Sequence, residues 1–151
     1  MLRAIQEFFR SHINSQQGGE HDEHSLQLAT AALLFEMQRA DHDEHPDERA
    51  ALETALKKTF SLSEAETREL AELAEREARE SVSLHQFTSL INNSFQVNEK
   101  IHIVEMLWRV AYADGRLDRY EEALVRKIAD LLYVPHRDFI QAKHRVREEL
   151  Q

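Results

Sequence analysis

Carboxylate side chains are concentrated in two short stretches of this sequence, each preceded by an apolar run that ends in Ala-Asp. The first stretch holds Asp41, Asp43, Glu44, Asp47 and Glu48, and the second holds Asp114, Asp118, Glu121 and Glu122. Such charges repel one another unless something compensates them. Hard divalent cations prefer oxygen ligands of this kind, and the unpaired N–H groups of a helix start also favour negative charge. The two stretches are therefore either cation sites or helix caps.

The spacing of the second stretch leaves both of these alternatives open. Asp118 and Glu121 are three residues apart, as in a capping box. A calcium loop of the EF-hand type counted from Asp114 would need Gly at its sixth position and Glu at its twelfth. The sequence has Arg119 and Val125 there. The EF-hand is excluded, whereas a different cation site and a metal-free cap both remain.

Histidine adds a second metal-ligating type to the first stretch. The tetrapeptide His-Asp-Glu-His occurs at 21–24 and again at 42–45. Histidines three residues apart face the same side of a helix, so His42, Asp43 and His45 are secondary metal candidates. The chain has no cysteine, which excludes thiolate sites and disulfides. The candidate ions are calcium, magnesium, manganese and zinc.

The two acidic stretches belong to a weak internal repeat. The segment from Phe35 to Leu52 aligns without gaps with the segment from Trp108 to Val125. In this alignment Asp41 meets Asp114, and Glu48 meets Glu121. Each copy reads as an apolar helix, an acidic turn and another helix.

The elements that carry these turns are predicted to be helices throughout. Apolar residues recur at helical spacing, and no segment alternates with period two for long enough to be a strand. Capping boxes at Ser63–Glu66 and Ser83–Gln86 predict two helix starts. Further starts are predicted at Pro46, Pro135, Asn98 and Asp118. The expected fold is all-α, with about eight helices.

The N-terminal part of the chain is expected to be separate from this bundle. Met1 to Ile13 forms a short amphipathic helix, and the polar stretch that follows contains Gly18-Gly19. We therefore divide the chain into an N-terminal helix and connector at 1–23 and a helical domain at 24–151. The 1–13 helix either docks on the domain or contacts a membrane or a partner.

Composition excludes several classes of function. The formal net charge of −9 argues against nucleic-acid binding, because phosphates require clustered positive charge. No apolar run is long enough for a transmembrane helix. The cytoplasm is the expected compartment, with contact to the inner membrane only through the 1–13 helix. The sequence lacks a phosphate loop and the common nucleophile motifs, so we expect no small-molecule substrate and no enzyme activity.

The residues of the second copy resemble the TerB family, which is named for a tellurite-resistance protein. The segment from Glu105 to Leu132 contains the family's Ala-Asp-Gly turn before an acidic helix start, and Arg39 to Leu52 resembles the first copy. Ser83 to Asn92 is similar to a bacterial TerB-like branch of unknown function. The resemblance extends roughly from Leu26 to Val146.

This resemblance implies a compact all-helical bundle with an internal pseudo-twofold repeat. It further implies a binding or scaffold module in a stress-response context, with protein partners. It also implies divalent-cation sites at the acidic turns, and relatives of the family include the N-terminal region of the DjlA co-chaperone. The site residues that follow from the motif are Asp114, Asp118, Glu121 and Glu122, with Asp41 and Glu48 in the first copy. A metal-free interaction module with capped turns is the alternative, and a metal-dependent hydrolase is a distant one.

Overall fold

The computed structural model describes residues 6–8, 10, 22–40, 46–60, 62–79, 83–113 and 119–150. For residues 37–40, 46–51, 77–79, 84 and 119–121 it describes the backbone alone. Helices dominate this part of the chain, and it contains no strand. The expected all-α fold is confirmed.

Seven helices have defined bounds in the described residues, and residues 6–8 and 10 are also helical. The helices are α2 (Glu23–Ala40), α3 (Pro46–Thr59), α4 (Glu64–Arg79), α5 (Leu84–Ser94), α6 (Val97–Ala113), α7 (Arg119–Leu131) and α8 (His136–Glu149). None of the described helices combines the length and apolar character needed to cross a membrane.

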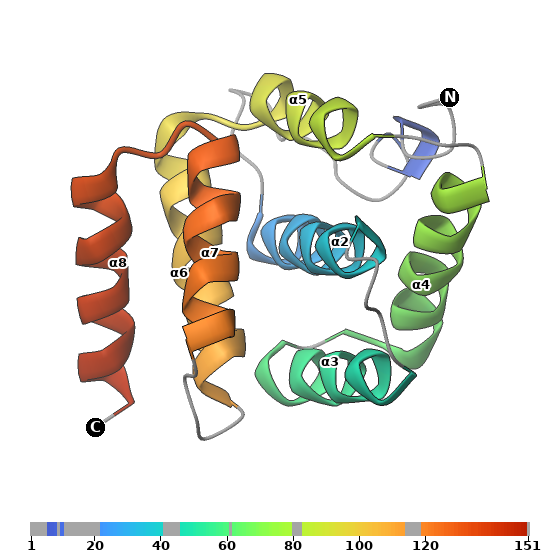
Figure 1. Ribbon diagram of the computed structural model, residues 1–151, viewed down its shortest axis with the longest axis horizontal. Coiled ribbons are helices and arrows are strands. Elements are labelled where there is room, and N and C mark those ends of the chain that lie inside the picture. Colours follow the sequence, from blue (N-terminus) through green and yellow to red (C-terminus); the bar gives the residue numbers. More distant parts are fainter. Residues whose placement is uncertain are drawn as a thin grey trace.

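The helix α2 lies at the centre of the fold, and in the view of Figure 1 it has α5 above it, α3 below it, α4 on one flank and the α6–α8 group on the other. Its middle part, from Leu28 to Glu36, is buried on every side, as expected of a helix that is apolar over most of its surface, whereas Glu23 and His24 at its start are exposed. Its buried apolar residues are Leu26, Leu28, Ala29, Ala31, Ala32, Leu33, Leu34 and Phe35.

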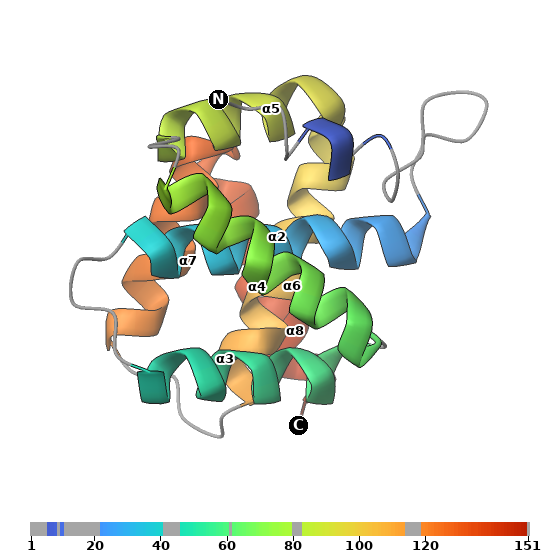
Figure 2. The ribbon, with the colours of Figure 1, turned by 90° about the vertical axis from the view of Figure 1, so that its right-hand side faces the viewer.

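The second central helix is α6, which crosses α2 and packs most extensively against α8 (Figures 1 and 2). Trp108 of α6 is fully buried. Where the two helices cross, the Thr30 hydroxyl donates to the Leu26 carbonyl at 2.8 Å and lies 3.5 Å from the Met106 sulfur. The one hydroxyl at this crossing is therefore satisfied within the core. Phe8 of the N-terminal segment belongs to the same core, at 5 % exposure.

Two of the predicted helix starts are confirmed in atomic detail. The Ser63 hydroxyl accepts from the Glu66 N–H at 3.1 Å, and the Glu66 carboxylate accepts from the Ser63 N–H at 2.9 Å. Ser83 and Gln86 form the same reciprocal pair before α5. Pro46 opens α3 as predicted. The predicted cap at Asp118 lies outside the described residues.

The predicted cap at Asn98 is wrong, because α6 already begins at Val97. The carboxylate of Glu99 turns back and accepts from the Gln96 N–H at 2.9 Å. This bond satisfies a donor at the helix start that would otherwise lack a partner. The helix therefore starts before Asn98, which lies in its first turn.

The helix α7 ends in a Schellman motif. The Val134 N–H donates to the Ala129 carbonyl and the Tyr133 N–H donates to the Asp130 carbonyl, which is the bonding pattern of that motif. Tyr133 occupies the left-handed position with φ 59°, where glycine is usual because it has no Cβ. Its ring is 75 % exposed.

The helix bounds keep the spacing of the sequence repeat. The helices α2 and α6 end 73 residues apart, at Ala40 and Ala113, and α3 and α7 begin 73 residues apart, at Pro46 and Arg119. The pseudo-twofold relation between the two copies stays a prediction, as does the division of the chain at residue 23.

Candidate functional site

The second acidic turn joins α6 to α7, between Ala113 and Arg119. Asp114 and Asp118 lie outside the described residues. Glu121 is placed in the first turn of α7 by its backbone. Among the four predicted ligands of the second turn, Glu122 is the one whose side chain the structure describes. Its contacts show which groups surround the start of α7.

The carboxylate of Glu122 is paired with a lysine from another helix. Lys143 of α8 donates from Nζ to Glu122 Oε1 at 2.9 Å, and the two side chains are 21 % and 35 % exposed. The hydrogen bond from Lys143 lowers the pKa of Glu122, and the charges of Lys143 and Arg126 act in the same direction against partial burial. Glu122 is therefore ionised at neutral pH with a protein cation beside it.

An aromatic cluster lies beneath this ion pair. The Lys143 ammonium is 5.4 Å from the centroid of the Trp108 ring, within range of a cation–π interaction. Trp108 in turn stacks on Tyr112 at 6.0 Å and packs against Phe139 at 5.2 Å. The Trp108 Nε1 finds no hydrogen-bond partner among the described residues. The pair of Glu122 and Lys143 thus rests on the rigid interface of α6 and α8.

A second lysine contacts the other end of the turn. Lys58, in the last turn of α3, donates to the Ala113 carbonyl at 3.3 Å. Ala113 is the final residue of α6, where unpaired carbonyls favour a positive charge. Ammonium groups from other helices therefore contact the last residue of α6 and the fourth residue of α7, on either side of the second turn.

Residues 27–144, which extend from within α2 to within α8, match the family model described as "Tellurite resistance protein TerB". The chain belongs to the TerB family. The match includes both acidic turns and all the residues around the second turn described above. No curated protein and no solved structure is significantly similar to this TerB-family chain.

The first acidic turn of this TerB-family protein lies between Ala40 and Pro46. Asp41, His42, Asp43 and His45 are outside the described residues, and Glu48 is placed in α3 by its backbone alone. The predicted ligand set of the first turn therefore stays a prediction. Within the part of the chain that the structure describes, no group of three or more His, Asp or Glu side chains is placed to hold a metal ion.

One histidine of the first His-Asp-Glu-His tetrapeptide has a protein partner instead. His24 Nε2 lies 2.6 Å from Glu66 Oε2, which links the start of α2 to the start of α4. Burial raises the pKa of Glu66. The hydrogen bonds with Ser63 and His24 lower it by a larger amount together, so the net shift of the pKa is downward. The other histidine of this tetrapeptide, at position 21, is outside the described residues.

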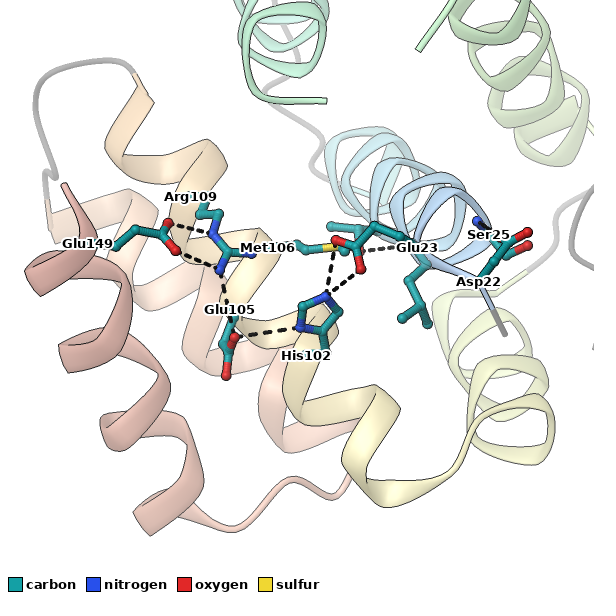
Figure 3. Close-up of polar contacts among 10 residues, drawn as sticks. Asp22, Glu23, Ser25, His102, Glu105, Met106, Arg109 and Glu149 are labelled. Carbon is teal, nitrogen blue, oxygen red and sulfur yellow. Dashed lines mark hydrogen bonds and ion pairs between the residues drawn. The ribbon is translucent and has the colours of Figure 1, made fainter. Parts of the chain in front are cut away.

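A polar network across α2, α6 and α8 was not anticipated from the sequence (Figure 3). His102 Nε2 lies 2.9 Å from Glu23 Oε2, and its Nδ1 lies 3.5 Å from Glu105 Oε2. Arg109 Nη2 lies 3.8 Å from Glu105 and its Nε donates to Glu149 at 2.8 Å. The hydrogen bond with Glu149 raises the pKa of Arg109, and the same bond lowers that of Glu149.

The residues that sequence reasoning missed share one property, which is that their partners are distant in the chain. Lys58 and Lys143 lie 55 and 21 residues from the groups they contact. A signal existed for part of this set. His102, Glu105 and Arg109 follow the i, i+3, i+7 spacing of one helix face, and Lys58 is a cation at a helix end, where cations are favoured.

Proposed function

We propose that this TerB-family protein is a non-enzymatic binding module for a protein partner, with a divalent-cation site at its second acidic turn. The ligands would be the oxygens of Asp114, Asp118 and Glu121. The observation that supports the proposal is the attachment of the turn at both described ends, through Lys58 and Lys143. Ends held by packed helices reduce the entropy lost when a turn closes around an ion.

The same two lysines favour a second candidate, a metal-free interaction module. One ammonium group lies at the Ala113 carbonyl, and the other already engages the Glu122 carboxylate. A divalent ion that recruits Glu122 must displace Lys143 from it. If the lysines alone compensate the turn, the carboxylates serve as helix caps and no ion is needed.

Thermal melting in the presence of calcium, magnesium, manganese or zinc separates these two candidates. An ion that binds the native state alone raises the melting temperature by mass action. We expect a rise with at least one ion for the wild type, and its loss in Asp114→Ala. Asp130→Ala is the matched control, because Asp130 is an exposed aspartate of α7 away from the turn. A melt that no ion shifts would leave the metal-free module as the function.

The partner itself is tested by capture on the immobilised full chain. A cation-dependent module loses its partner when a chelator is added, whereas a metal-free acidic module loses it when salt is raised. Hydrolysis of model phosphate esters or peptides with added manganese would instead support the distant alternative, a hydrolase. The cytoplasmic stress-response context rests on the family alone, and growth of a deletion strain on tellurite tests it.

A further inference from the structure

A groove of about 390 Å³ lies between α3 and α4. The two helices diverge from their short connection, as Figure 1 shows at its lower right. The consecutive helices α7 and α8 pack against each other, whereas the consecutive helices α3 and α4 are not among the closely packed pairs of helices. The groove is the space that this divergence leaves open.

The floor of the groove is small and its walls are charged. Thr67 and Ala71 form the floor, at 3 % and 8 % exposure. Glu53 and Lys57 of α3 face four residues of α4, which are Glu64, Arg68, Glu72 and Glu75. The lining residues of α4 follow helical spacing from 64 to 75, a length of about 16 Å at 1.5 Å per residue. Small floor residues allow another chain segment to approach closely.

The charged lining of the groove indicates which chemical class of ligand it would bind. Pockets for small molecules are mostly apolar, whereas the walls here carry four carboxylates and two cations. One of these cations, Lys57, is paired with Glu64 across the groove at 3.7 Å, with both side chains exposed at 43 % and 81 %. Exposed pairs of this kind contribute little stability. An incoming basic side chain can therefore replace Lys57 at little cost.

The groove also lies in the acidic part of a polarised chain. Residues 1–96 contain 18 Asp and Glu against nine Lys and Arg, whereas residues 97–151 contain ten of each. The whole net charge of −9 is thus carried by residues 1–96, which include α3 and α4. Complementary charge of this kind steers a basic partner towards one side of a protein.

We propose that the α3–α4 groove binds a helical segment rich in Lys and Arg from a partner protein. Basic residues on one face of that segment match Glu64, Glu72 and Glu75, which lie on one face of α4 with Arg68 between the first two. This inference rests on the proposed function as a protein-binding module and names the surface and the class of partner. It is independent of any ion at the second acidic turn.

The test uses the full chain and a fluorescein-labelled alanine peptide of about 16 residues with Lys or Arg at every third or fourth position. Such a peptide is long enough to form a helix. We expect saturable binding by fluorescence anisotropy that weakens as salt is raised. Chemical shifts of wild-type amides should change mainly at 53–58 and 64–75. A peptide with Glu at the basic positions should not bind.

The variant Glu64→Gln/Glu72→Gln should bind the basic peptide about fivefold more weakly, as expected for the loss of two exposed ion pairs. The control Asp130→Asn/Glu148→Gln removes the same charge from the exposed surface of α7 and α8 and should bind as the wild type does. Circular dichroism verifies that both variants are folded.

Three outcomes would overturn the groove assignment. They are an absence of binding to the wild type, equal weakening by the control variant, or shift changes centred on other helices. The ion titration does not involve the groove carboxylates, and the capture assay detects a partner bound at any surface of the chain. If those assays succeed and the peptide fails, the groove is wrong and the binding module stands. If the peptide binds and capture fails, the proposed partner function is in doubt instead.

Discussion

Replacement of Lys143 by Met tests the described end of the second acidic turn. The substitution keeps a long apolar stem but removes the ammonium group that lies 2.9 Å from Glu122 and 5.4 Å from the Trp108 ring. A partly exposed ion pair contributes about 0.5–1 kcal/mol, and a cation–π contact contributes a similar amount, about 0.5–1 kcal/mol. We therefore expect Lys143→Met to lower the free energy of unfolding by about 1–2 kcal/mol.

Two assays measure this effect. For a domain of this size, the loss corresponds to a fall of about 2–8 °C in melting temperature. The chain has a single tryptophan, so the emission spectrum reports on Trp108 alone and should change when the ammonium is removed. Lys127→Met is the matched control, because Lys127 is exposed on α7. Its spectrum and melting temperature should remain close to those of the wild type.

A double-mutant cycle with Glu122→Gln isolates the ion pair from the cation–π contact. The pKa of Glu122 is lowered in the folded state, so its contribution is present above the unfolded pKa and is lost as the pH falls through the folded value. The coupling between the two residues should be full at neutral pH and should be lost only as the pH falls through the lowered pKa of Glu122 in the folded state. A coupling of zero at neutral pH, or an unchanged Trp108 spectrum in Lys143→Met, would refute the described geometry.

Three further substitutions have expected outcomes. Tyr133→Gly should raise the free energy of unfolding by about 0.5–1 kcal/mol, because glycine relieves the left-handed backbone strain, and a lower melting temperature would contradict this. Ser83→Ala should cost about 1 kcal/mol in urea unfolding through loss of the capping box before α5, whereas Ser89→Ala, within α5, should cost less. Phe8→Ala should cost about 3 kcal/mol if the N-terminal helix docks through its buried ring. An unchanged melting temperature together with loss of liposome flotation would show that Phe8 serves a membrane instead.

The success of the fold prediction has a local cause. Capping boxes at Ser63 and Ser83 are contacts between residues three apart, so a short stretch of sequence is enough to predict them. The cap predicted at Asn98 was wrong because two neighbouring residues, Asn98 and Glu99, can each satisfy N–H groups at the start of α6. The carboxylate of Glu99 reaches back to Gln96 and starts α6 earlier. Helix propensity alone does not rank such alternatives.

The candidate site was predicted less completely, because its character depends on residues far away in the chain. The sequence located the carboxylates of the second turn from their spacing around the Ala-Asp motif. It did not predict that Lys58 contacts the Ala113 carbonyl or that Lys143 contacts Glu122, since each lysine comes from a helix that packing alone brings there. A choice between a cation site and a metal-free turn depends on these lysine contacts, which the sequence did not predict.

By itself the sequence determined the helical class, most helix starts and the family, because apolar periodicity, capping residues and a short motif are local properties. Tertiary structure decided which charges meet. It paired Glu122 with Lys143, His102 with Glu23 and Arg109 with Glu149, and it separated α3 from α4 to leave the charged groove. These outcomes depend on how helices cross, since a side chain's electrostatic surroundings are set by whatever the packed core brings within a few ångströms.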